Sequence, residues 1–299
     1  MKRKFRRYGN NGSKMDIFDN KDIEPMLIGE ECEPFDSADW LYELKLDGER
    51  CIAYLSSDST ELRNKRNEKM LPKMPELSNI HTYIKNKCIL DGELSIIKNG
   101  QPDFFEIQRR SLMSNPIKIG IASKINPACY TAFDILYYEN RPTVNMSLTE
   151  RKELLKSVII SESPLFAYSR YIEYRGTDFF ELAKKQNLEG IVAKKKDSLY
   201  YFGKRTKEWL KIKNMKDDDF VVCGYIFKEN YIISIVLGQY NDEKLIYKGH
   251  VTTGVGGESF KIIEALPKNV NPPFAENIPS SNNGGIWVEP CLLYTSRCV

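Results

Sequence analysis

The order of apolar and polar positions predicts strands alternating with helices over roughly the first 215 residues. Six runs rich in β-branched and aromatic residues predict strands, at Trp40–Leu44, Arg50–Leu55, Cys88–Ile97, Ala128–Tyr138, Gly190–Lys194 and Trp209–Lys213. Helices are predicted at Pro75–Ile84, Phe104–Met113, Ser147–Ile160 and Thr177–Gln186. The third helix has the clearest start, because Ser147-Leu-Thr-Glu150 forms a capping box before an apolar-periodic run.

The pattern changes after Met215, where strands dominate. The acidic run Asp217–Asp219 precedes three predicted strands and one short helix, at Phe220–Phe227, Tyr231–Tyr240, Lys244–Thr253 and Ser259–Ala265. We therefore expect an α+β protein with a mixed domain at residues 21–215 and a small β-barrel-like domain at 216–290. The polar residues 1–20 are expected to form a flexible basic arm.

Composition narrows the chemistry that the chain can carry. The seven cysteines are scattered and none forms a C-x-x-C pair, which argues against a zinc ribbon or a disulfide framework and suits a reducing cytosol. His81 and His250 are the two histidines, too few for a histidine-rich metal centre and unfavourable for a Ser-His-Asp triad. No apolar run of about 18 residues and no signal-peptide core is found, so we expect a cytoplasmic protein without a membrane span.

The net charge of +3 is unevenly distributed. Residues 1–14 contain six basic and no acidic residues, and residues 194–216 contain nine basic and two acidic residues, so the remainder is acidic. The second basic segment is interleaved with aromatic residues, which favours a phosphate-binding surface over an ordinary solvated face. Lys211 and Lys213 alternate with apolar residues, so their side chains should share one face of a half-buried strand.

The motif Lys45-Leu-Asp47-Gly48-Glu-Arg50 follows a predicted strand. One interpretation is a hairpin turn with Asp-Gly at its apex. The chemical interpretation is a lysine nucleophile held beside a tight turn. Keeping a lysine of ordinary pKa neutral at pH 7 costs about 4–5 kcal/mol, unless desolvation or neighbouring cations lower that pKa.

This motif resembles the nucleotidyl-transfer motif of ATP-dependent DNA ligases and of the related RNA ligases and mRNA capping enzymes. Further segments resemble the family's other motifs and occur in the same order: Asn64-Lys-Arg66-Asn, Leu90-Asp-Gly92-Glu93-Leu, Phe133-Asp134-Ile-Leu136, Glu189-Gly190-Ile-Val-Ala-Lys194 and Trp209-Leu-Lys211-Ile-Lys213. Taken singly, several of these segments are as typical of turns, core strands or exposed faces. Their joint order supports the resemblance, which covers roughly residues 24–290.

The resemblance implies a nucleotidyltransferase (ATP-grasp-like) adenylation domain followed by an OB-fold domain at 216–290. It implies that Lys45 attacks ATP to form a lysine–AMP intermediate, assisted by Lys211 and Lys213. The ATP-binding residues it implies are Glu43, Leu44, Arg50, Arg66, Glu93, Phe133, Lys194, Lys211 and Lys213. Glu93 and Glu189 are the expected ligands of Mg²⁺ or Mn²⁺, and Lys204, Arg205 and Lys207 are the expected DNA contacts.

The function implied is that of a compact bacterial or phage DNA ligase, acting as a monomer on nicked double-stranded DNA. NAD-dependent relatives carry an extra N-terminal domain and a zinc finger that do not fit this sequence, so ATP is favoured. An RNA ligase or capping-type nucleotidyltransferase is one alternative. An inactive nucleic-acid-binding module is another, although the intact Lys45, Glu93 and Glu189 disfavour it.

The last residues differ from the family pattern. The basic Arg-x-Asp-Lys motif with which the family usually ends is missing, and Cys291–Val299 can be back-translated into a sequencing-transposon end followed by its reverse complement. We therefore expect residues 291–299 to be foreign and the natural chain, truncated here, to continue. The expected consequence is weak self-adenylation with better sealing of pre-adenylated nicks.

Overall fold

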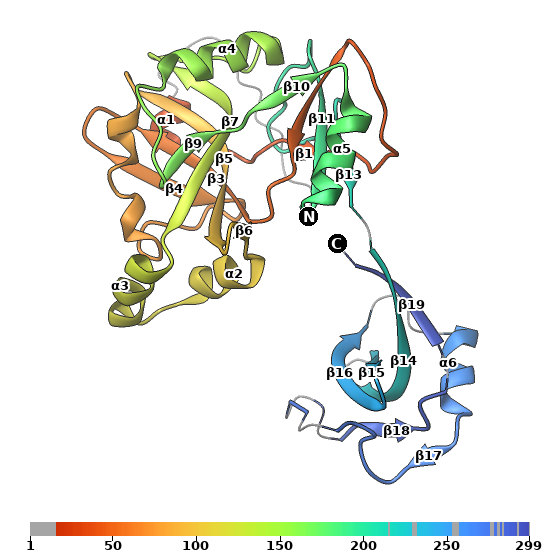
Figure 1. The fold of residues 1–299 in the computed structure, drawn as a ribbon. Coiled ribbons are helices and arrows are strands. Elements are labelled where there is room, and N and C mark those ends of the chain that lie inside the picture. The colour runs from red at the N-terminus through yellow and green to blue at the C-terminus, as the bar shows by residue number, and fades with distance from the viewer. Residues whose placement is uncertain are drawn as a thin grey trace, which may run out of the picture. The chain divides into compact units, whose positions relative to one another are not determined.

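The computed structural model describes residues 16–214, 216–228, 232–252, 257–275, 278–279, 282, 284–291 and 293–298. The chain divides into two compact units, Met1–Asn214 and Met215–Val299 (Figure 1). Within these described ranges, no helix combines the length and the apolar character that crossing a membrane requires.

The larger sheet of the first unit has seven strands. Its order is β4 (Thr60–Asn64), β3 (Glu49–Leu55), β5 (Cys88–Lys98), β7 (Ala128–Tyr138) and β8 (Arg141–Pro142), with β6 (Gln101–Pro102) beside β5 and β9 (Phe166–Tyr168) beside β7. One face buries an apolar core against α4 (Leu148–Val158), α2 (Phe104–Leu112) and the 3-10 helices η1 (Pro75–Leu77) and η2 (Ile80–Tyr83). The other face packs against α1 (Ile17–Asn20) and Trp209.

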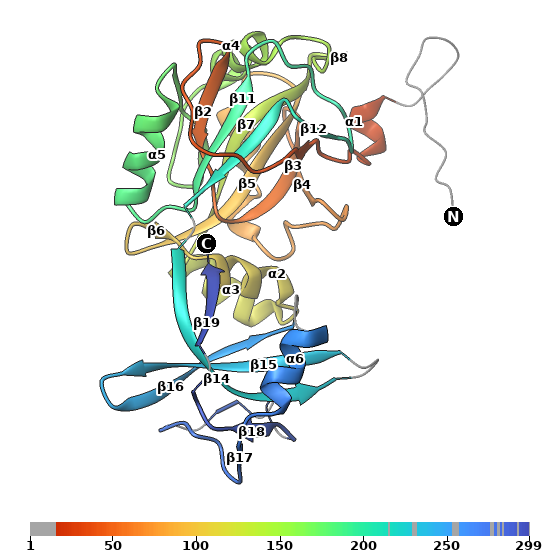
Figure 2. The same ribbon diagram turned by 90° about the vertical axis from the view of Figure 1, so that its right-hand side faces the viewer.

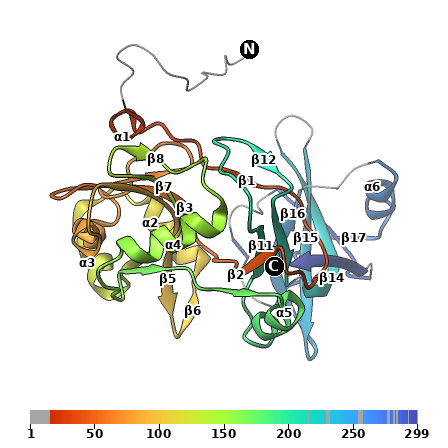
Figure 3. The ribbon, with the colours of Figure 1, turned by 90° about the horizontal axis from the view of Figure 1, so that it is seen from above.

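The second sheet of this unit has four strands, in the order β10 (Tyr171–Glu173), β2 (Trp40–Leu44), β11 (Gly190–Lys195) and β13 (Trp209–Lys213). Alternate residues bury one face against α5 (Gly176–Lys185), which lies beside β11 in Figures 1 and 3. Residues at the intervening positions point to the opposite face. A short parallel pair, β1 (Leu27–Ile28) and β12 (Arg205–Thr206), forms a separate two-stranded sheet.

The smaller unit is built around strands β16 (Lys244–Val251), β15 (Ile233–Asn241), β14 (Lys216–Phe227), β18 (Ile286–Val288) and β17 (Lys268–Asn269), in that order (Figure 2). Helix α6 (Gly257–Glu264) buries Phe260 and Ile263 against these strands. Residues Leu293–Cys298, within the segment expected to be foreign, form β19 and pair with β14. Their origin stays a prediction.

Most predicted elements of the first unit are confirmed to within a residue or two. The capping box is present, since the Ser147 side chain accepts from the backbone N–H of Glu150 and the Glu150 side chain accepts from that of Ser147. Two predictions need correction. The helix predicted at Pro75–Ile84 is two 3-10 helices, because the buried Met74, Leu77 and Ile80 recur every three residues.

The prediction of a flexible arm over residues 1–20 is wrong for residues 17–20. Residues 17–20 form α1, with Ile17 and Phe18 buried in the core, and residues 1–15 lie outside the described ranges. Helix α3 (Pro116–Ile125) was not predicted from the sequence, although Asn115 caps it and Pro116 begins it in the way helices prefer.

Candidate active site

Lys45 lies at the end of β2, where the two carboxylate-bearing motifs converge. Its backbone N–H donates to the carbonyl of Gly190 at 2.9 Å, which extends the β2–β11 ladder by one residue. Its Nζ forms an ion pair with the Glu189 carboxylate, and the two side chains are only 19% and 13% exposed. The predicted nucleophile and a predicted metal ligand therefore touch.

Two glycines, Gly48 and Gly190, allow the strands that carry these side chains to approach each other closely. A Cβ on Gly48 would lie 2.1 Å from the carbonyl oxygen of Leu94 on β5. Gly190 has φ +131°, and a Cβ there would lie 2.1 Å from the carbonyl oxygen of Ile212 on β13. Any side chain at either position would push the strands apart and displace Lys45 or Glu189.

A cavity of about 480 Å³, counting the part open to solvent, lies beside Lys45. It is lined from both sheets, by Ile28, Glu43, Leu44, Lys45, Leu46, Arg50, Glu93, Phe133, Val192, Lys194 and Trp209. Aromatic and aliphatic walls with a few charged groups suit a planar, polar-edged ligand such as a nucleotide base. Seven of the predicted site residues line this single cavity.

Three buried charges meet at one wall of this cavity. One oxygen of the Glu43 carboxylate lies 2.6 Å from Lys152 Nζ and 3.0 Å from Lys194 Nζ. Burial raises the pKa of Glu43, but the two ammonium groups outweigh that effect, and the pKa lies below its ordinary value. Burial lowers the pKa of Lys194 to about 8, against the opposing pull of Glu43.

Phe133 is less available than the sequence suggested. The Arg50 guanidinium lies 4.4 Å from the ring centroid, and Lys194 Nζ also lies 4.4 Å from it. Arg50 is held there by two hydrogen bonds of 2.5 Å to the buried Asp91 carboxylate. A base can stack on this ring only if Arg50 or Lys194 moves.

Glu93 and Glu189 crowd the cavity near Lys45. Burial raises the pKa of Glu93 to about 8, although the nearby Arg50 and Lys45 lower it. Glu189 Oε2 is buried and has no hydrogen-bond partner. Among the described residues no group of three or more His, Cys, Asp and Glu side chains could hold a metal ion. Two carboxylates supplemented by substrate phosphates are the usual magnesium site of phosphoryl-transfer enzymes, so this pair fits Mg²⁺.

The remaining predicted residues fall into two groups by location. Lys211 lies opposite Val192 in the β11–β13 ladder, and its Nζ is 3.6 Å from the Glu31 carboxylate. Lys213 lies opposite Gly190, the residue whose carbonyl accepts from the backbone N–H of Lys45. Lys194 is four residues beyond Gly190, roughly 13 Å along the strand, and its Nζ lies beside the rings of Phe133 and Trp209.

Outside the cavity of Lys45, the surface carries the other predicted cations. Arg66 and Glu93 both line a second, larger cavity of about 1010 Å³. Lys204, Arg205 and Lys207 are exposed around β12, with Lys207 Nζ 3.3 Å from Glu30 and Arg205 donating to the carbonyl of Gly29.

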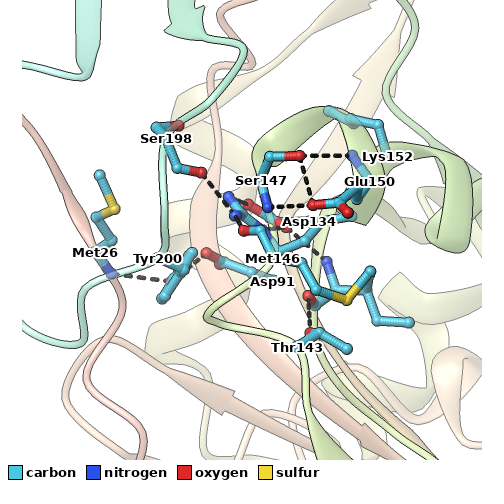
Figure 4. A network of polar contacts seen from close by, with 12 residues as sticks. Met26, Asp91, Asp134, Thr143, Met146, Ser147, Glu150, Lys152, Ser198 and Tyr200 are labelled. Atoms are coloured by element: carbon cyan, nitrogen blue, oxygen red, sulfur yellow. Dashed lines mark hydrogen bonds and ion pairs between the residues drawn. The ribbon is translucent and has the colours of Figure 1, made fainter.

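A polar network that includes the buried residues Asp91, Asp134 and Tyr200 lies between the strands and α4 (Figure 4). Arg151 on α4 donates two hydrogen bonds to Asp134 and one each to the carbonyls of Met146 and Ser198. Tyr200 donates to Asp91 at 2.5 Å and accepts from the backbone N–H of Met26. The network thus ties β5, β7 and the segment before β13 together, and it fixes the Asp91 carboxylate that holds Arg50.

Residues 25–213 match the model of the family described as "ATP dependent DNA ligase domain". The chain belongs to the ATP-dependent DNA ligase family. It is therefore a ligase-class enzyme, which confirms the function predicted from the Lys45 motif. The mixed α/β nucleotidyltransferase-type domain is confirmed with it.

Relatives agree with this membership. The chain is 32% identical over 207 residues to the "SPbeta prophage-derived DNA ligase-like protein LigB" of Bacillus subtilis (strain 168), covering 69% of this chain and 73% of that protein. It is 27% identical over 266 residues to the "Multifunctional non-homologous end joining protein LigD" of Pseudomonas aeruginosa, covering 84% of this chain but only 30% of that protein. Among solved structures, "mycobacterial DNA ligase D complexed with ATP and MES" has the same fold, with TM-score 0.59, 22% identity and coverage of 93% and 89% of the two chains.

Three residues at the candidate site were not predicted from the sequence. Trp209 lines the cavity, and Asp91 and Lys152 contact residues that line it. Lys152 could have been noticed, because Leu148, Arg151, Lys152 and Leu155 occupy the buried stripe of a helix. A lysine at such a position needs a buried partner. No local pattern, however, identifies that partner as Glu43.

Proposed function

We propose that this ligase seals 5′-phosphate/3′-hydroxyl nicks in duplex DNA by three nucleotidyl transfers through Lys45. In the first, Lys45 Nζ loses a proton and forms a bond to the α-phosphorus of ATP, while the bond to pyrophosphate breaks. In the second, the 5′-phosphate of the nick takes AMP and Lys45 is released. In the third, the 3′-hydroxyl displaces AMP and closes the phosphodiester bond.

The observation that carries this proposal is the contact between Lys45 and Glu189 at the mouth of the base-sized cavity. The Glu189 carboxylate is the acceptor nearest the proton that Lys45 must lose. Glu93 and Glu189 would hold the Mg²⁺ ion, whose contribution when bound is to neutralise negative charge on the phosphates. Lys211 and Lys213, on the same strand face, would contact the α-phosphate.

At the other end of the cavity, the base would lie between Val192 and the aromatic walls. Glu43 is placed to accept a hydrogen bond from the 6-amino group of adenine, since its carboxylate lines the cavity and stays ionised. Arg50 would leave Phe133 for the ribose or a phosphate. Lys204, Arg205 and Lys207 would contact the DNA backbone as exposed cations.

We propose further that the second unit is an OB-fold that tracks the DNA backbone. Its curved antiparallel strands with one packed helix support this. The chain spans about a third of the LigD proteins it matches. The names of those proteins state a part in non-homologous end joining. For this chain we propose only the sealing step of such a process.

The test is transfer of label from [α-³²P]ATP to the protein, followed by chase onto nicked duplex DNA. Wild-type chain should become labelled and pass the label to DNA, and Lys45→Ala should not become labelled. Lys45→Arg keeps the charge but should also remain unlabelled. Labelling of Lys45→Ala at the wild-type rate would overturn the proposal, and so would preference for a nicked RNA duplex.

A further inference from the structure

Lys152 is a buried charge for which the proposed chemistry has no use. It lies on the buried stripe of α4 and is only 3% exposed. Burying an ammonium group costs several kcal/mol unless it is paired, and an apolar side chain of similar size can often replace such a group without loss of stability. The packing of α4 therefore gives no reason for a lysine at this position.

The partner of Lys152 is a residue of the base-binding wall. Lys152 Nζ lies 2.6 Å from Glu43 Oε1, closer than the 3.0 Å of Lys194 Nζ to the same atom. Glu43 and Lys194 line the cavity, whereas Lys152 does not. Lys152 thus approaches the carboxylate from α4, outside the lining of the cavity.

The two lysines cannot have the same role. Lys194 Nζ lies 4.4 Å and 4.3 Å from the centroids of the Phe133 and Trp209 rings. Lys194 therefore contacts the rings of the cavity itself, where a bound base would be its neighbour. Lys152 can keep its contact with Glu43 whether or not the cavity is occupied.

We propose that Lys152 is a positioning residue for base selection, which holds the Glu43 carboxylate as a charged acceptor at the edge of the base. A 6-amino group donates a hydrogen bond to that acceptor. A 6-oxo group, as in hypoxanthine or guanine, sets a second acceptor against it and leaves both unpaired. This inference rests on the proposed function, since it assumes that the cavity binds the nucleotide.

The test compares Lys152→Met with wild type in self-adenylation by ATP and nucleotidylation by ITP, which carries a 6-oxo group. KM for ATP should rise roughly tenfold with kcat within about twofold, and the ATP/ITP ratio of kcat/KM should fall roughly tenfold. The ATP/ITP ratio of kcat/KM does not depend on the fraction of protein that is active, because both nucleotides are tested with the same preparation. Lys156→Met removes an exposed lysine one turn further along α4 and should change neither value.

Two further variants keep the result decisive. Glu43→Gln should lose the same preference, and adding Lys152→Met to it should lower the ratio no further, because the two residues act through one carboxylate. Should Lys152→Met not fold, Lys152→Gln replaces it, and the expected loss of preference is the same.

An unchanged ATP/ITP ratio in a folded Lys152 variant would overturn the inference, and so would additive effects in the double variant. Wild-type chain that takes label from neither nucleotide would instead contradict the proposed function on which the inference rests.

Discussion

Glu43 and Glu93 line the same cavity, but their pKa values are shifted in opposite directions. Glu43 has two ammonium groups within 3.0 Å, and its pKa lies below the ordinary value despite burial. Burial raises the pKa of Glu93 to about 8, although Arg50 and Lys45 lower it. The charge of Glu43 is therefore stabilised by ion pairs within the protein, whereas the cations near Glu93 do not offset its loss of hydration.

The difference separates two tasks. The wall around Glu43 is organised before any ligand arrives, which suits recognition of a neutral base that brings no charge of its own. Because burial disfavours the charged form of Glu93, a cation at this point would stabilise its carboxylate, which suits the metal ion that we propose arrives with the nucleotide. Four predictions test this division, from the largest expected effect to the smallest.

The first tests the rigidity behind the base-binding wall. Arg151 and Asp134 are both 0% exposed, so Arg151→Met leaves a buried carboxylate without its partner. Urea denaturation should show a loss of about 3–5 kcal/mol in the free energy of unfolding. Arg170→Met, which breaks an exposed ion pair with Glu162, should cost no more than about 1 kcal/mol. Equal losses in the two variants would show that the network does not stiffen this wall.

The second removes the carboxylate that pairs with Lys45. Glu189→Gln should lower the rate of self-adenylation by about a hundredfold, because the variant lacks both the proposed proton acceptor for Lys45 and a proposed metal ligand. Glu181→Gln, on an exposed position of α5, serves as the control. Rapid-quench labelling gives the rate. If Glu189→Gln adenylates itself as fast as wild type, the surroundings of Glu93 and Glu189 do not have the separate task that distinguishes them from the wall around Glu43.

The third uses pH to probe Lys194. Its pKa is lowered to about 8 in the folded chain, so between about pH 8 and its ordinary value of 10.5 the unfolded chain binds more protons. Stability attributable to this lysine therefore rises with pH across that window and is unaffected by pH below it. Unfolding free energies measured from pH 7 to 10.5 should show a smaller rise for Lys194→Met than for wild type. Identical pH profiles would mean that Lys194 is not strained by burial.

The last and smallest effect concerns DNA. Removing one lysine that neutralises a phosphate should reduce the slope of log K for nicked duplex against log salt by about 0.9. Lys204→Ala and Lys207→Ala should each have this effect. Lys184→Ala and Lys185→Ala, on α5 behind the four-stranded sheet, should leave the slope unchanged. A reduced slope in the α5 variants would place the DNA elsewhere on the surface.

Several features could be predicted from the sequence because their causes are local. Alternation along Trp209–Lys213 put Lys211 and Lys213 on one face, and the β11–β13 register agrees. The spacing of motifs marked Lys45, Glu93 and Glu189 as candidates, and these side chains do lie within electrostatic reach of one another. The capping box fixed the start of α4 for the same reason: its hydrogen bonds join residues only three apart.

Other features depended on contacts between distant segments. The Arg50 guanidinium lies over the Phe133 ring, and a hydrogen bond to Asp91 on another strand holds Arg50 in that position. The periodicity of α4 could reveal that Lys152 is buried but not that it meets Glu43.

The sequence by itself therefore determined the family and most strands and helices, and it singled out Lys45 as the candidate nucleophile, because short-range periodicity and motif order carry that information. Only the tertiary structure decided which charges are compensated and which are not. A pKa, an ion pair and a stacked ring depend on distances across the two sheets, and these distances exist only once the strands have paired.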